Sequence, residues 1–193
     1  MGFYEFAREV TRVFFKVFYN LRAEGVENIP ADGGVILCSN HISTLDPPLI
    51  GTPLNRRIHF MAKAELFKIP LFKQLITVLG AFPVKRGSVS KETIRYAQKL
   101  LAEGGMLGIF PEGTRGGGGM GKKGAASLAL RAGATVIPVA IIGRYRLFRQ
   151  MKIVYGKPVD LSRFAGQSNS ETLEEATELI MDSIRKLVQE HSK

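Results

Sequence analysis

The first 23 residues divide into an apolar side and a polar side at the spacing of a helix. Apolar residues recur at i, i+3, i+4 and i+7, while Glu5, Glu9, Arg12 and Lys16 fall on the opposite side. Further aromatic residues widen the apolar arc beyond the stripe that a core-facing helix needs. We expect residues 1–23 to form an amphipathic helix at a membrane interface, although a terminal helix packed on the domain would show the same pattern. The apolar stripe consists of Phe3, Phe6, Ala7, Val10, Val13, Phe14, Val17 and Leu21.

Short apolar runs alternate with helical patterns along the rest of the chain. Residues 64–79, 90–103 and 122–131 predict helices, and a last helix is expected to begin at Ser168 or Ser170 and to continue to residue 190. The alternation predicts an α/β fold, with residues 24–193 forming a single domain around a mixed, mostly parallel sheet flanked by helices. The predicted strands are residues 35–38, 58–62, 81–84, 106–110, 136–142 and 152–155.

The charge of the chain narrows the expected partners. Lys and Arg total 27 against 17 Asp and Glu, a formal net charge of +10. Such an excess attracts anionic lipid headgroups, phosphorylated small molecules or nucleic acid. Charged residues interrupt the first 25 positions, which therefore fit neither a signal peptide nor a membrane-spanning helix. The single cysteine, Cys38, excludes an intrachain disulfide and a multi-cysteine zinc site, and it favours a reducing cytoplasm.

Polar residues directly follow the first buried strand, in the sequence NHISTLD at residues 40–46. If the chain turns between them, the carboxylate of Asp46 can accept a proton from one nitrogen of His41 and raise the basicity of the other nitrogen. This is the acid–base part of a serine-protease relay without its nucleophile, whose place a substrate hydroxyl could take. A histidine after a strand is, however, more often structural.

Two arginine-bearing segments follow other strands. The sequence FPEGTR at residues 110–115 offers a glycine for close backbone approach and a guanidinium for phosphate. The sequence GAFPVKR at residues 80–86 places another arginine after a short strand. These arginines could be solvated surface charges, but their position after strands favours phosphate binding.

Other candidate sites are weaker. Residues 116–123, GGGGMGKK, approach a nucleotide phosphate loop but lack the hydroxyl that would hold magnesium. Cys38 lies in an apolar strand, where a thiol is usually inert, so an acyl-cysteine route is disfavoured. No motif supplies further ligands for a metal at His41 and Asp46, and His59 and His191 have no motif partners. We therefore expect no metal.

Four segments together resemble the ordered blocks of the glycerolipid acyltransferases, closest to the bacterial 1-acylglycerol-3-phosphate (lysophosphatidic acid) acyltransferases. They are residues 40–46, 80–86, 110–115 and 136–139, and the likeness spans residues 24–160. It implies that His41 is the general base and Asp46 its orienting partner, and that Pro138 shapes a wall near the acyl donor. It implies further that the glycerol phosphate is bound by Arg86, Glu112, Gly113, Thr114 and Arg115.

The same resemblance implies the substrates. A fatty acyl thioester of acyl carrier protein or coenzyme A would be the co-substrate, with no other cofactor, and the lysophosphatidic acid hydroxyl would attack it directly to give phosphatidic acid. The enzyme would lie peripherally on the cytoplasmic face of the cell membrane, on an anionic surface, and would bind no nucleic acid. Where the family commonly has Ser and a polar stretch, this chain has GGGGM at residues 116–120, which puts contacts of that loop in doubt. The alternatives are glycerol 3-phosphate or another lysophospholipid as acceptor, or a non-enzymatic basic module that binds membrane or nucleic acid.

Overall fold

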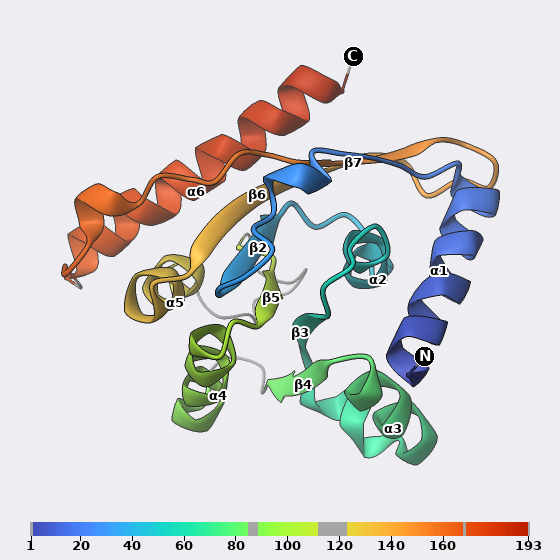
Figure 1. Cartoon of the computed structure of the whole chain (residues 1–193), viewed down its shortest axis with the longest axis horizontal. Coiled ribbons are helices and arrows are strands. Elements are labelled where there is room, and N and C mark those ends of the chain that lie inside the picture. The colour runs from blue at the N-terminus through green and yellow to red at the C-terminus, as the bar shows by residue number, and fades with distance from the viewer. Residues whose placement is uncertain (1, 85–88, 112–122, 168, 193) are drawn as a thin grey trace.

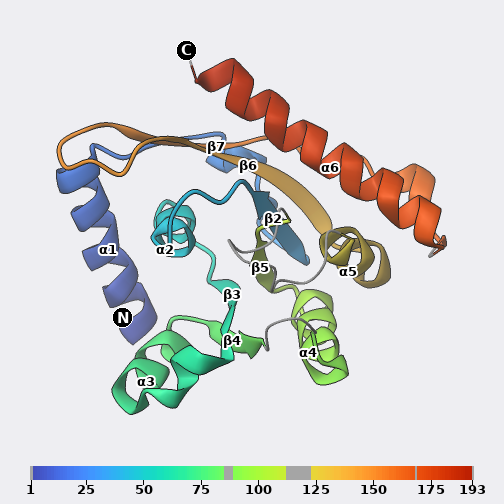
Figure 2. The same cartoon turned by 180° about the vertical axis from the view of Figure 1, so that it is seen from behind.

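The structure, a computed structural model, describes residues 2–84, 89–111, 123–167 and 169–192. Arg86 and residues 112–115 lie outside the described residues. The described residues form a seven-stranded sheet with helices on both sides, which confirms the predicted α/β fold (Figures 1 and 2). The helices are α1 (Phe3–Tyr19), α2 (Asp46–Gly51), α3 (Pro70–Val78), α4 (Lys91–Ala102), α5 (Gly124–Ala132) and α6 (Ser170–His191), with short 3-10 helices at Val26–Asn28, Ala64–Lys68 and Ser162–Phe164.

The sheet is mixed but mostly parallel, as predicted. Its strands are β1 (Arg22–Glu24), β2 (Val35–Ser39), β3 (Ile58–Lys63), β4 (Ala81–Val84), β5 (Met106–Ile109), β6 (Thr135–Gly143) and β7 (Met151–Tyr155), in the order β1-β7-β6-β2-β5-β3-β4. Strands β6, β2, β5, β3 and β4 are parallel, whereas β7 runs antiparallel to β6 and carries β1 in parallel. The carboxyl ends of the five parallel strands therefore share one edge, where ligands bind in folds of this kind.

Side chains alternate between two hydrophobic clusters along the strands. On one face, Ile36 and Cys38 pack with buried residues of α4, α5 and α6. On the other face, Val35 and Leu37 pack with α1 and α2. Figure 1 shows the same division, with α1 and α2 on one side of the strands and α4, α5 and α6 on the other. This continuous apolar character is expected of central strands that are covered on both faces.

Several predicted boundaries were wrong. The first helix ends at Tyr19 rather than near residue 23, because Asn20 adopts a left-handed conformation (φ 41°) and the chain turns into β1. Residues 64–79 form a 3-10 turn and then α3, since Pro70 cannot continue a helix from the preceding turn but suits the first position of a new one. The predicted start of the last helix is confirmed, because α6 begins at Ser170, and its cap is Asn169, whose side chain accepts from the backbone N–H of Thr172 at 2.8 Å.

Helix α1 packs on the domain through a face other than its apolar stripe. Phe15 and Tyr19 are buried, while the Arg8 and Arg12 guanidinium groups donate to the carbonyls of Asn55 and Thr52 at 3.1 and 2.8 Å. The predicted stripe points outward, with the side chains of Phe3, Phe6, Val10, Val13 and Val17 each more than half exposed. The helix is therefore packed on the domain, as one of the two alternatives predicted, and it still presents an apolar surface. Its place at a membrane interface stays a prediction.

A second exposed apolar surface lies on α3. Leu71 is 81% exposed, and Ile69, Phe72, Leu75 and Val78 are also exposed. Helix α3 lies near the amino end of α1 in both views of the fold. In the part of the chain that the structure describes, no helix is long and apolar enough to cross a bilayer.

Candidate active site

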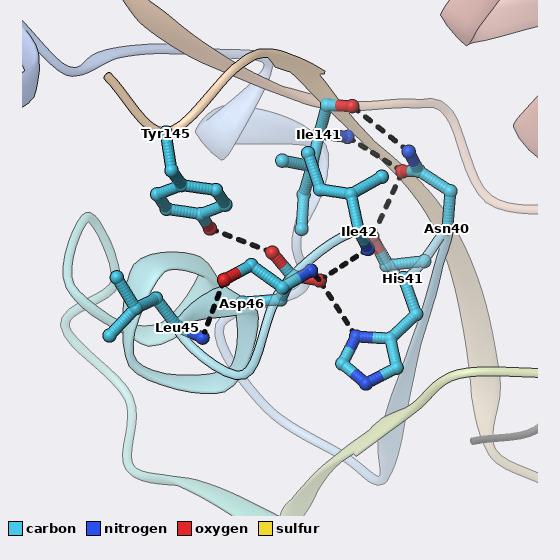
Figure 3. A network of polar contacts seen from close by, with 9 residues as sticks. Asn40, His41, Ile42, Leu45, Asp46, Ile141 and Tyr145 are labelled. Carbon is cyan, nitrogen blue, oxygen red and sulfur yellow. Dashed lines mark hydrogen bonds and ion pairs between the residues drawn. The ribbon is translucent and has the colours of Figure 1, made fainter. Parts of the chain in front are cut away.

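The loop from β2 to α2 brings His41 and Asp46 together (Figure 3). Nδ1 of His41 lies 2.7 Å from Oδ2 of Asp46, and the backbone N–H groups of Ile42 and Ser43 donate to the same oxygen at 2.7 and 2.8 Å. Because Oδ2 accepts from both amides, we assign the proton of the third contact to Nδ1 of His41. That assignment leaves Nε2 of the ring without a proton, which is the form of a general base.

Tyr145 completes the surroundings of the carboxylate. Its phenol donates to Oδ1 of Asp46 at 2.7 Å from the loop between β6 and β7. Burial raises the pKa of Tyr145 above its usual value, and the hydrogen bond to Asp46 raises it further, so the phenol remains a donor at neutral pH. The Asp46 side chain is fully buried, whereas that of His41 is 15% exposed. A buried carboxylate with four donors is satisfied, and the ring that it holds still reaches solvent.

Phe110, the first residue after the neighbouring strand β5, supports the imidazole. Its ring stacks on that of His41, with centroids 4.1 Å apart and an interplanar angle of 24°. Phe60 of β3 lies behind it, with ring centroids 6.2 Å apart. The stack follows from the pairing of β2 with β5, which places the residues after both strands side by side. Two independent contacts, a carboxylate at Nδ1 and a ring on one face, therefore fix the orientation of His41.

Asn40 anchors the loop between β2 and α2 to the sheet. Its side-chain amide donates to the carbonyl of Ile141 at 2.9 Å, and its side-chain oxygen accepts from the N–H of Ile141 at 2.8 Å. The amide thus pairs with β6 as a strand residue would, although β2 has ended at Ser39. This pairing fixes the backbone immediately before His41.

The predicted phosphate ligands follow strands that lead to the same edge. Residues 112–115 come directly after Pro111, the last described residue after β5, and Arg86 follows β4 by two positions. Phe110, two residues before Glu112, already touches His41. The roles of these residues as phosphate ligands stay predictions.

The structure places Pro138 away from the His41–Asp46 pair. It lies within β6 opposite Cys38 of β2, and a side chain built on Gly156 would touch both the Pro138 ring and Leu187 of α6. The ring thus faces the α6 side of the sheet, whereas Tyr145 and Phe110 pack with the cluster on the other face. Its part in an acyl-donor wall stays a prediction.

The other titratable candidates lie apart from this centre. Cys38 is buried in β2, where desolvation raises the pKa of its thiol to about 12. Burial and the charge of Arg57 lower the pKa of His59, which lies in β3. His191 lies beside Lys152 and Glu24 at the far end of the sheet order. Among the described residues, no three His, Cys, Asp or Glu side chains gather into a group that could hold a metal ion.

Sequence reasoning missed three contributors to the site. Tyr145 lies 99 residues from Asp46 in a basic loop, so no spacing links the two. Asn40 begins the NHISTLD segment, but nothing in the sequence indicates that its side chain pairs with β6. Phe110 could have been found, because it directly follows a strand and precedes a segment already assigned to the site.

At the carboxyl edge of a mostly parallel sheet, a buried carboxylate thus holds a histidine whose ring reaches solvent, the arrangement that a general base requires. Residues 20–142 match the family model described as acyltransferase. The chain is 32% identical over 191 residues to the 1-acyl-sn-glycerol-3-phosphate acyltransferase of Bacillus subtilis, covering 95% of this chain and 96% of that one. The protein therefore belongs to the acyltransferase family, and it is an enzyme of that class.

Two further relatives agree with this assignment. The 1-acyl-sn-glycerol-3-phosphate acyltransferase of Borreliella burgdorferi is 34% identical over 129 residues, which are 64% of this chain and 52% of that one. The crystal structure of the 1-acyl-sn-glycerophosphate (LPA) acyltransferase PlsC of Thermotoga maritima superposes with a TM-score of 0.70 at 28% identity. That match covers 97% of this chain and 81% of the other. The fold and the family thus agree over nearly the whole chain.

Proposed function

We propose that the protein transfers a fatty acyl group from an acyl thioester to the free hydroxyl of lysophosphatidic acid, giving phosphatidic acid. The observation that carries this proposal is the 2.7 Å contact between Nδ1 of His41 and Oδ2 of Asp46. Support comes from the Bacillus subtilis enzyme, a 1-acyl-sn-glycerol-3-phosphate acyltransferase that aligns over almost the full length of both chains.

In the proposed reaction, Nε2 of His41 removes the proton of the acceptor hydroxyl as its oxygen attacks the thioester carbonyl. The tetrahedral intermediate then expels the thiolate. The thiolate accepts this proton from the imidazolium and leaves as a thiol. Asp46 stabilises the imidazolium that exists between these two steps. The acyl group passes directly to the acceptor without an acyl-enzyme, in keeping with the raised pKa of the buried Cys38 thiol.

The phosphate of the acceptor would be bound by Arg86, Glu112, Gly113, Thr114 and Arg115. Their strands support this assignment, because β4 and β5 are parallel to β2 and their carboxyl ends lie at the edge that carries His41. A guanidinium offers two parallel donors to a phosphate, which fixes both its position and its orientation. The thioester would belong to coenzyme A or to acyl carrier protein, with no cofactor beyond this co-substrate.

The protein would work as a peripheral enzyme on the anionic cytoplasmic face of the membrane. The outward apolar stripe of α1 and the exposed apolar residues of α3 would enter the interface between headgroups and acyl chains. The net charge of +10 would favour an anionic surface. A surface this apolar suits a bilayer better than nucleic acid, whose backbone is bound by cationic and polar groups.

A panel of acceptors tests the proposed activity. The purified protein would be incubated with mixed acyl thioesters and, separately, with lysophosphatidic acid, glycerol 3-phosphate and other lysophospholipids, and products would be identified by mass spectrometry. Lysophosphatidic acid should be acylated faster than any other acceptor of the panel, and its product should be phosphatidic acid. Preferential acylation of glycerol 3-phosphate would assign the enzyme to a different acceptor, and an absence of transfer to every acceptor would refute the reaction.

A further inference from the structure

The connection between β6 and β7 presents two large apolar side chains at the tip of a turn. The N–H of Arg149 donates to the carbonyl of Arg146 at 3.1 Å, which closes a four-residue turn with Leu147 and Phe148 at its centre. Leu147 is 59% exposed and Phe148 is 72% exposed. Side chains of this size are seldom placed at the tip of a solvated turn, where Gly, Asn and Asp predominate.

The backbone at this tip is also in an uncommon conformation. Phe148 has φ of 61°, in the left-handed region that a bulky residue rarely occupies. The conformation is held from outside the turn, because the N–H of Phe148 donates to the carbonyl of Phe18 in α1 at 2.7 Å. A large apolar residue kept exposed in such a conformation indicates a binding role for the side chain.

The tip continues the apolar surface of α1. The rings of Phe148 and Phe18 lie 6.1 Å apart, and Phe18, Val17 and Phe14 of α1 are themselves exposed. Figure 1 shows the β6–β7 connection reaching the carboxyl end of α1, while α3 lies near its amino end. The apolar residues of the turn, α1 and α3 thus follow one side of the molecule.

The same loop is strongly basic. Arg144, Arg146 and Arg149 are all exposed and flank the two apolar residues. Guanidinium groups around an apolar tip match the phosphate layer and the acyl layer of an anionic bilayer at once. An acidic protein would be attracted by the same charges, but it would not account for the apolar surface that extends from the tip along α1.

We propose that the 144–150 loop is a lipid-docking element, which inserts Leu147 and Phe148 into an anionic phospholipid bilayer and sets its arginines against the headgroups. This inference rests on the proposed function, whose lipid acceptor lies in the same bilayer. Tyr145 belongs to this loop and donates to Asp46, and the three residues from Tyr145 to Phe148 span at most about 10 Å of chain. Docking of the loop therefore sets the His41–Asp46 pair close to the surface that supplies the acceptor.

Sedimentation with vesicles of phosphatidylcholine and phosphatidylglycerol in equal amounts tests the loop. Leu147→Ser/Phe148→Ser should weaken partitioning by about 10-fold at both low and high salt, since two apolar side chains no longer leave water. Arg144→Gln/Arg146→Gln/Arg149→Gln should weaken it by about 10-fold or more at low salt and much less at high salt, where ions screen the arginines.

Matched controls come from α4, on the other face of the sheet. Tyr96→Ser removes another exposed aromatic side chain, and Lys91→Gln/Arg95→Gln/Lys99→Gln removes the same amount of charge from exposed positions. Neither control should change partitioning by more than about twofold, because α4 lies away from the docking surface. Loop variants that sediment like the unaltered protein, or controls that lose as much as the loop variants, would overturn the proposal.

Two further measurements separate the possible failures. Acyl transfer to a short-chain, monomeric lysophosphatidic acid without vesicles should be the same for Leu147→Ser/Phe148→Ser as for the unaltered protein. A loss of this activity equal to the loss of vesicle binding would show that the loop acts on the site and not on lipid. If the arginine variant lost affinity for acyl carrier protein and kept its vesicle binding, the loop would dock a protein. If the unaltered protein transferred no acyl group, the proposed function would be refuted. The vesicle sedimentation would still test whether the 144–150 loop docks on lipid.

Discussion

The imidazole of His41 stacks on the ring of Phe110 with 4.1 Å between centroids, and the two residues follow the neighbouring parallel strands β2 and β5. The stack covers one face of the imidazole, while Asp46 holds the ring edge at Nδ1. The ring can then turn only by breaking one of these contacts, so Nε2 keeps a fixed direction. Such preorganisation is what a base needs when it meets an acceptor hydroxyl within hydrogen-bond distance.

Replacing the stacked ring should lower turnover while preserving the fold. Phe110→Leu keeps an apolar side chain of similar volume but removes the flat contact, which is worth about 0.5–1.5 kcal/mol for a ring pair. We expect kcat to fall by up to about 10-fold, with little change in the melting temperature. Phe60→Leu is the matched control, because Phe60 stacks on Phe110 rather than on His41. Equal kcat values for the Phe110 variant and the unaltered enzyme would contradict the role assigned to the stack.

Tyr145 should act as a positioning residue through Asp46. Tyr145→Phe removes the 2.7 Å bond to Oδ1 and leaves one side of a buried carboxylate without its donor, a cost of about 1–3 kcal/mol. We expect kcat to fall roughly 10-fold while KM for the acceptor stays within about twofold, because the phenol does not touch the substrate. The same change at Tyr19, whose ring lies 5.6 Å from that of Tyr145, is the control. A rise in KM with unchanged kcat would mean that Tyr145 binds substrate instead.

Asp46→Asn should separate charge from shape. The amide oxygen can still accept at the Oδ2 position, and its NH2 group can donate to the hydroxyl of Tyr145, so the hydrogen bonds and the fold can persist. What is lost is the negative charge that stabilises the imidazolium. We expect kcat to fall by a factor on the order of 10³, with circular dichroism unchanged. Turnover near that of the unaltered enzyme would exclude the carboxylate from the mechanism.

The thiol of Cys38 should be unreactive in the folded protein. Burial raises its pKa to about 12, so the thiolate is nearly absent at neutral and mildly alkaline pH and appears only as the pH approaches that value. Iodoacetamide should leave the native protein unmodified and fully active, and should alkylate the unfolded chain, where the thiol regains a pKa near 8.5. Mass spectrometry of both forms checks this prediction. Rapid native alkylation that abolished transfer would revive an acyl-cysteine route.

Much of the fold could be predicted because its central strands are covered on both faces. Continuous apolar runs such as residues 35–38 are typical of buried strands between helices, and the predicted strands agree with the observed ones to within a residue or two. Strand β1 was missed, since Arg22, Ala23 and Glu24 are exposed and form a strand only by pairing with β7. The pattern also could not predict that the apolar stripe of α1 points away from the domain, because periodicity defines a face of a helix but not what covers it.

Some contacts of the candidate site could be predicted from the sequence, and others depend on the tertiary fold. His41 and Asp46 are five positions apart in one loop, so their pairing could be inferred from local chain geometry. Tyr145 reaches Asp46 from 99 residues away, and only the return of the chain along β6 brings them together. Phe110 lies between these cases, since its contact follows from the pairing of two strands that had each been predicted.

The proton-accepting role of residue 41 is tested most directly by His41→Ala, assayed for phosphatidic acid formed from lysophosphatidic acid and an acyl thioester. The substitution removes the imidazole that is proposed to accept the hydroxyl proton, and general-base catalysis contributes about 10²–10⁴ in rate. The variant should bind anionic vesicles like the unaltered protein and yet lose transfer by a factor in that range. Transfer at close to the unaltered rate would contradict the role of His41 as the general base.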